Sequence, residues 1–89
     1  MEVEYKPGFI KDFNKIKSRK DQEEIYRICF DEIPEVKSFS GIKNLKKIKG
    51  YEYYYRIRKG DWRIGFKVEG ERIIFMRVRK RSDIYKTFP

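Results

Sequence analysis

The 89-residue sequence contains no histidine and only one cysteine, Cys29. These absences exclude an internal disulfide, a zinc finger and any histidine-dependent catalytic arrangement. No apolar run approaches the roughly 20 residues needed to cross a bilayer, and the N-terminal "MEVEYK" lacks the apolar stretch of a signal peptide. We therefore expect a cytoplasmic protein with no membrane partner, no metal and no other cofactor.

Positive charge is abundant: 23 Lys and Arg residues stand against 14 Asp and Glu residues, which gives a formal net charge of +9. On so short a chain this excess creates a strong positive field that attracts polyanions, and nucleic acid is the obvious candidate. Aromatic residues reach 17% and apolar residues fall in periodic runs, so we expect the chain to fold despite its polarity. Its length predicts a single domain, residues 1–89, with one core.

Hydrophobic periodicity predicts a strand and a helical hairpin in the first half of the chain. Residues 2–6 alternate polar and apolar side chains before they meet the breaker at Pro7. Apolar spacings of three and four predict one helix within 9–17. The same spacing predicts a second helix that ends at Ile33, because the next residue is Pro34.

The second half of the chain predicts an antiparallel sheet. Its β-type runs are separated by "RKGDW" and "VEGER", whose glycines suit tight hairpin turns. We place three strands at about 52–59, 62–69 and 72–79. The expected fold class is therefore α+β: an N-terminal strand, a helical hairpin, an antiparallel sheet of about four strands and a short C-terminal helix.

Side chains alternate along a strand, so the two faces of this sheet are expected to differ. One face is predicted to carry cations from all three strands: Arg56, Arg58, Arg63, Lys67, Arg77 and Arg79. The other face is predicted to pack against the helices through Tyr53, Tyr55, Ile57, Trp62, Ile64, Phe66, Val68, Ile74, Met76 and Val78.

The cationic face needs an explanation, because like charges at cross-strand positions destabilise a sheet by up to about 1 kcal/mol a pair. A solvated face that prevents edge aggregation is the structural explanation. Arginine dominates over lysine on this face, however, and guanidinium binds phosphate in a bidentate manner and stacks on bases. We therefore favour a phosphate-rich ligand.

The C-terminal "RVRKRSDIYKTFP" extends the cationic face through Arg79, Lys80 and Arg81, and its "SDIYK" segment returns Tyr85 to that face. Tyr85 is equally consistent with a ring that fills the edge of the core. Trp62 has the same two interpretations and is assigned to the core. Tyr54 is a weaker candidate for stacking on a base.

The chain resembles the RelE toxins of bacterial and archaeal type II toxin–antitoxin systems, which are ribosome-dependent mRNA endoribonucleases. The segment "KIKGYEYYYRIRKGDWRIGF" is similar to the family's "L.G..YRIRVGDYRVIY" pattern, and "IIFMRVRKRSDIY" is similar to its terminal "V..V.HR..IY" pattern. The resemblance covers nearly the whole chain, and archaeal members look closest. It implies the RelE-like microbial RNase fold and three partners: mRNA, the ribosome and a RelB-like antitoxin.

The resemblance also implies residues that hold RNA. Arg56 and Arg58 fall where RelE proteins grip the mRNA backbone, and Arg63 falls where they hold the scissile phosphate. Charge on the same face adds further RNA-binding candidates, namely Lys67, Arg77 and Arg79.

The implied catalytic set is Arg63, Lys80, Arg81 and Tyr85. Arg81 and Tyr85 match the family's terminal arginine and tyrosine, and Lys80 stands where many relatives carry histidine. The implied reaction needs no metal, because the ribose 2′-hydroxyl attacks the adjacent phosphorus. Tyr85 would act as base or as stacking group, and Arg81 or Lys80 as proton donor or charge stabiliser.

Two other functions stay open. ParE-type toxins share the fold but inhibit DNA gyrase, and they generally lack the constellation that Arg63, Arg81 and Tyr85 form here. A non-catalytic RNA-binding module would bind with a steep salt dependence and cleave nothing. For the toxin interpretations, the net charge of +9 predicts an antitoxin with an acidic segment.

Overall fold

The computed structural model describes all 89 residues as one sheet with helices on both sides. Its elements are β1 Glu2–Tyr5, α1 Pro7–Asn14, α2 Arg19–Tyr26, a π-helical turn Arg27–Glu32, α3 Ile33–Glu35, a 3-10 turn Phe39–Gly41, β2 Leu45–Lys47, β3 Tyr54–Lys59, β4 Trp62–Glu69, β5 Arg72–Lys80 and α4 Arg81–Ile84. No helix combines the length and the apolar character needed to cross a membrane.

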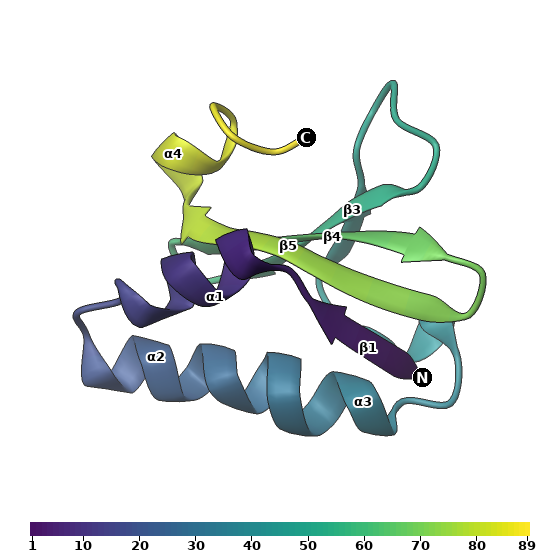
Figure 1. The fold of residues 1–89 in the computed structure, drawn as a ribbon, viewed down its shortest axis with the longest axis horizontal. Coiled ribbons are helices and arrows are strands. Elements are labelled where there is room, and N and C mark those ends of the chain that lie inside the picture. The colour runs from purple at the N-terminus through teal and green to yellow at the C-terminus, as the bar shows by residue number, and fades with distance from the viewer.

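The five strands lie in the order β1-β5-β4-β3-β2. Strands β2 to β5 form an antiparallel meander, and β1 adds a parallel edge beside β5. Figure 1 shows α2 and α3 on one side of the sheet, and α4 with the C-terminus on the other. The α+β prediction is confirmed, and the three predicted strands are correct to within two residues at each end.

Two hairpins of the sheet each have a two-residue turn that begins with a glycine. Gly60 lies between β3 and β4 with φ +57°, and Gly70 lies between β4 and β5 with φ +61°. This left-handed conformation matches the twist of the flanking strands and costs glycine little, since glycine has no Cβ. The meander is therefore encoded locally.

The predicted stop before Pro34 is wrong, because the helix continues to Glu35. Arg27–Glu32 forms a π-helical turn, in which backbone donors bond to carbonyls five residues earlier. Pro34 has no donor, and the carbonyl five residues before it, that of Cys29, accepts the Tyr5 hydroxyl instead, at 2.7 Å. Burial raises the pKa of Tyr5 to about 12, so this hydroxyl stays a donor.

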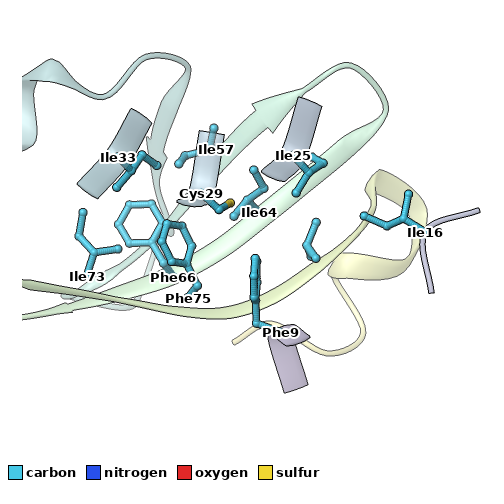
Figure 2. Packing of buried hydrophobic residues seen from close by; sticks show 11 residues of the cluster. Phe9, Ile16, Ile25, Cys29, Ile33, Ile57, Ile64, Phe66, Ile73 and Phe75 are labelled. Carbon is cyan, nitrogen blue, oxygen red and sulfur yellow. The ribbon is translucent and has the colours of Figure 1, made fainter. Parts of the chain in front are cut away.

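Eleven buried side chains form the core between helices and sheet (Figure 2). Burying one such side chain contributes on the order of 1.5–3 kcal/mol relative to leaving it exposed. Burial also raises the pKa of the Cys29 thiol, which is therefore unreactive. The members are Phe9, Ile16, Ile25, Cys29, Ile33, Ile57, Ile64, Phe66, Ile73, Phe75 and Val78.

A β-bulge changes which residues of β5 face this core. The register shifts between Gly65 and Phe66, whose partners are Arg77 and Phe75, so Met76 is an extra residue in β5. Strict alternation breaks at that point, because β5 uses three residues, Phe75 to Arg77, where β4 uses only two, Gly65 and Phe66.

The predicted core face is therefore wrong for two residues of β5. Ile73 and Phe75 belong to the helix-facing core in place of the predicted Ile74 and Met76. The prediction is also wrong for Tyr53, which precedes β3 and is 58% exposed.

A second, smaller apolar group lies outside the helix-facing core. Ile74, Ile84 and Phe88 are all buried, and Phe88 packs over Gly65. We call residues 81–89 the C-terminal strap. The strap covers the middle of the face to which the sequence assigned only cations.

Candidate nucleic-acid interface

Strand register arranges the predicted cations in rows on the face opposite the helices. Arg58, Arg63 and Arg79 are direct cross-strand neighbours on β3, β4 and β5. Arg56 and Arg77 occupy the next row and are separated by a glycine of β4. The prediction that each strand sends cations to one face is confirmed.

One half of this face is hollowed into a cleft of about 480 Å³, which we call the arginine cleft. It contains five cations and no acidic residue, and none of these cations makes a salt bridge. Unneutralised charge in a concave surface focuses a positive potential. The lining residues are Asn44, Leu45, Lys46, Arg56, Arg58, Arg63, Arg81 and Tyr85.

Tyr85 lies at this cleft with 61% of its surface exposed, so the interpretation that its ring merely fills the core edge is wrong. The Arg56 guanidinium carbon lies 4.7 Å from the centre of the Tyr85 ring. Arg56 lowers the pKa of Tyr85 through hydrogen bonding and positive charge, and Arg81 adds to the effect. The phenolate is thereby favoured relative to an isolated tyrosine.

Local structure places Arg81 and Tyr85 together. Arg81 begins α4, and its backbone N–H donates to the carbonyl of Asp61 at 2.8 Å, which fixes the start of the helix against the β3–β4 turn. Positions four residues apart on a helix lie on one side, so both side chains reach the cleft. The intervening Ile84 is fully buried and anchors α4 to the sheet.

The β3–β4 turn also holds Arg63 at the cleft. Nη1 of Arg63 donates to the carbonyls of Gly60 and Trp62, in each case at 2.9 Å. Trp62 packs against the helix-facing core, as predicted, and its indole N–H donates to Asp21 at 3.0 Å. One side of the Arg63 guanidinium is thus fixed by backbone, while no carboxylate neutralises it.

Two of the three arginines of β5, the predicted site residues Arg77 and Arg79, lie elsewhere, at the buried carboxylate of Asp12 from α1. Nε of Arg77 is 2.9 Å from Oδ2 of Asp12, and Nε of Arg79 is 3.3 Å from Oδ1. Oδ2 also accepts the backbone N–H of Val78 at 3.2 Å. Asp12 therefore replaces a strand partner at the edge of β5, beyond the end of β1.

The two predicted lysines also lie outside the arginine cleft. Lys67 pairs with Glu69 at 2.8 Å, and this hydrogen bond raises the pKa of Lys67. Nζ of Lys80 lies 5.7 Å from the centre of the Trp62 ring and lines a different cavity. Of the nine predicted site residues, the structure brings together only Arg56, Arg58, Arg63, Arg81 and Tyr85.

The sequence interpretation missed Lys46. This residue lies on the three-residue strand β2, directly across from Arg56, while its neighbour Leu45 faces Ile57 of the core. The alternation of one apolar and one cationic residue was the available signal, but so short a strand gives it little weight. Tyr54 packs against Phe88, with ring centres 5.7 Å apart.

The arginine cleft can hold a phosphodiester, since unpaired guanidiniums make strong charge-assisted hydrogen bonds to phosphate oxygens. An exposed tyrosine with a lowered pKa can accept a proton or stack on a base. No group of three or more acidic or cysteine side chains is placed to hold a metal ion.

Comparisons with known proteins place the chain among toxins. A family model described as "ParE toxin of type II toxin-antitoxin system, parDE" matches residues 3–85. The chain is also 39% identical over 90 residues to Toxin RelE3 of Methanocaldococcus jannaschii, with 100% of both chains covered.

Solved structures share the fold, and two of them are toxin–antitoxin complexes. The crystal structure of a RelB-RelE antitoxin–toxin complex from Methanococcus jannaschii matches with a TM-score of 0.82 at 39% identity, over 98% of this chain and 100% of that one. YafQ from E. coli matches with a TM-score of 0.72 at 16% identity, over 94% and 97% of the two chains. The RelBE2 complex from Mycobacterium tuberculosis matches at 0.70 and 16%, over 90% and 96%. The predicted RelE-like fold is confirmed.

Proposed function

Because the chain belongs to the ParE toxin family of type II toxin–antitoxin systems, we propose that it is a RelE-type toxin that cleaves mRNA in the ribosomal A site. One observation carries the proposal: five cations without acidic partners surround an exposed tyrosine in the arginine cleft. This composition suits a substrate that brings its own negative charge.

RNA supplies the nucleophile in the proposed reaction. The 2′-hydroxyl oxygen attacks the adjacent phosphorus, and the bond from phosphorus to the 5′ oxygen breaks, which leaves a 2′,3′-cyclic phosphate and a 5′-hydroxyl. The phenolate of Tyr85 takes the 2′ proton, while water protonates the leaving oxygen. Arg63 and Arg81 donate hydrogen bonds to the oxygens on which charge develops.

The proposed base sets a limit on the rate in the absence of a ribosome. A tyrosine with its ordinary pKa of about 10 is a poor base at neutral pH, and this cleft improves it only through the arginines that lower the Tyr85 pKa. Slow cleavage of free RNA follows. Positioning of the 2′-hydroxyl by the ribosome then supplies the rest of the rate acceleration, a contribution that in general can lower the activation barrier by several kcal/mol.

The proposed partner is a RelB-like antitoxin, because the Methanococcus jannaschii relative was solved in a RelB-RelE complex. The net charge of +9 favours an antitoxin with an acidic segment. Acidic peptides should therefore bind more tightly than neutral or basic peptides of equal length, as measured by isothermal titration calorimetry. Equal affinities would remove the charge part of this proposal.

Primer extension on mRNA in programmed ribosomes tests the nuclease proposal. The wild type should produce cuts within the A-site codon, and Tyr85→Phe should weaken them because it removes the proton acceptor. Tyr53→Phe is a matched control, since it removes the hydroxyl of a similarly exposed tyrosine outside the cleft. Intact mRNA with the wild type would contradict the proposal.

The parDE description of the matching family model favours one second candidate, inhibition of DNA gyrase. A gyrase inhibitor would block supercoiling by purified gyrase and leave ribosomal mRNA intact. Under this alternative the unpaired cations of the cleft have no catalytic task. Cuts in mRNA without an effect on supercoiling would exclude gyrase inhibition.

A further inference from the structure

The C-terminal strap is fixed to the sheet on both sides of Tyr85. Ile84, which comes just before it, is fully buried, and Phe88, three residues after it, is 4% exposed. The backbone N–H groups of Thr87 and Phe88 both donate to the carbonyl of Ile84, at 3.1 and 2.9 Å, and close a tight turn around Tyr85. The exposed tyrosine therefore projects from a short segment with two buried ends.

Phe88 packs on Gly65 and Tyr54, which we call its seat, and this packing requires a glycine beneath the Phe88 ring. A Cβ on Gly65 would lie 2.6 to 2.8 Å from three carbons of the Phe88 ring, closer than such atoms approach in real proteins. Gly65 lies within β4, and its backbone does not adopt the left-handed conformation that favours glycine. The absence of a side chain at position 65 is thus explained by the ring rather than by the backbone.

The same ring separates the two groups of arginines. Gly65 lies between Arg56 and Arg77 in one cross-strand row, so Phe88 stands over the gap between them. Arg56 contacts Tyr85 on one side of the ring, and Arg77 contacts Asp12 on the other. Tyr54 packs against Phe88 from β3 and completes the seat.

We propose that Phe88, seated on Gly65, is the positioning residue of the arginine cleft and that it holds Tyr85 over Arg56. The catalytic part of this inference rests on the proposed nuclease function. The geometric part does not, because the placement of Tyr85 can be measured without any RNA.

The first test measures the placement of Tyr85 directly. Protein labelled with ¹³C at the tyrosine Cζ is titrated by NMR, and Tyr85→Phe identifies the Tyr85 signal. In Phe88→Ala, the midpoint of the Tyr85 titration should rise toward the value of an ordinary tyrosine, because the Tyr85 ring is no longer held next to Arg56. The conservative Phe88→Leu should restore most of the shift. Thr87→Ala is the matched control, since it alters an exposed side chain of the same strap.

The second test measures single-turnover cleavage of ribosome-bound mRNA below the melting temperature of every variant. Phe88→Ala should lower the rate by about a hundredfold, the effect expected when a reacting group moves by about 1 Å. Gly65→Ala should act in the same direction. Added to Phe88→Ala, it should cost nothing more, because no ring remains for its Cβ to meet.

Two results would overturn the inference. One is an unchanged Tyr85 titration in Phe88→Ala whose melting curve shows a folded protein. The other is losses from Gly65→Ala and Phe88→Ala that multiply in the double variant. If the wild type cleaves no mRNA, the proposed function fails, and the Tyr85 titration still decides whether the seat positions this residue. If Phe88→Ala does not fold, Gly65→Ala carries the same titration test.

Discussion

Arg79 and Arg81 are separated by one residue, yet they lie on different halves of one basic face. Nε of Arg79 lies 3.3 Å from the buried carboxylate of Asp12, whereas Arg81 lines a cleft with no acidic residue. An arginine paired with a buried carboxylate supports the folded structure and is not free to bind a ligand, because separating the pair would leave a buried charge without a partner. The location of the acids, rather than the count of arginines, therefore defines the candidate site.

Removal of a cation from the acid-free half should give the largest effect. Arg63→Ala should lower single-turnover cleavage of ribosome-bound mRNA by about 10² to 10³-fold, the usual loss for one donor to a developing charge. Arg63→Lys should recover only part of the rate, because a lysine is a point charge without the planar fork of arginine. Full activity in Arg63→Lys would show that charge alone matters. Arg72→Ala, which removes a β5 arginine outside the cleft, is the control.

Removal of the acid from the other half should affect folding. Asp12→Ala should destabilise the protein by about 3 kcal/mol, because it leaves two arginines and one backbone N–H without their partner. Thermal unfolding should show a drop of roughly 12–24 °C in melting temperature for a domain of this size. Asp31→Ala removes an exposed carboxylate and should change little. An unchanged melting temperature in Asp12→Ala would mean that the pair does not support the fold.

Within the cleft, pH should separate Arg56 from Arg58. The phenolate form of Tyr85 is the proposed base, so cleavage should rise with pH and level off near the Tyr85 pKa, below the ordinary tyrosine value. Arg56→Gln removes the main cause of the lowered pKa and should move this rise to higher pH. Arg58→Gln removes a cleft cation other than Arg56 and Arg81, the two arginines that lower the Tyr85 pKa, and should leave the midpoint in place. Identical midpoints in the two variants would remove Tyr85 as the base.

The smallest expected effect concerns Lys46, which lies at the edge of the arginine cleft. Its removal in Lys46→Ala should lower the slope of log binding constant against log salt concentration by about 0.7 for single-stranded RNA, the value of one phosphate contact. Fluorescence anisotropy with a short RNA measures this slope. Lys6→Ala removes a lysine already paired with Glu4 and should leave the slope unchanged. Equal changes in both variants would indicate a diffuse field rather than a contact.

The sequence was sufficient for features with a local cause. Glycines at turn positions and alternating side chains predicted the meander, and motif resemblance with four-residue spacing brought Arg81 and Tyr85 together. The bulge at Met76 could not be predicted, because one extra residue in a strand leaves no mark in its composition. It reversed the alternation that had placed Ile74 in the helix-facing core.

Ion pairs between residues far apart in the chain also could not be predicted from the sequence. Asp12 and Arg77 are 65 positions apart, and nothing near either residue indicates that they meet. The same limit applies to Lys80, whose neighbours Arg79 and Arg81 turn to opposite halves of the face. Charge on a strand could be predicted, but its neutralisation by a distant acid depends on how α1 docks against β5.

Arg79→Ala and Arg81→Ala, compared side by side by primer extension on programmed ribosomes, test most directly whether the acid-free half is the active half. Both variants lose one arginine from neighbouring positions, and the assay is run below both melting temperatures. We expect Arg81→Ala to lose the A-site cuts and Arg79→Ala to keep them for each folded molecule. Equal losses, or the reverse order, would contradict the division of the basic face by Asp12.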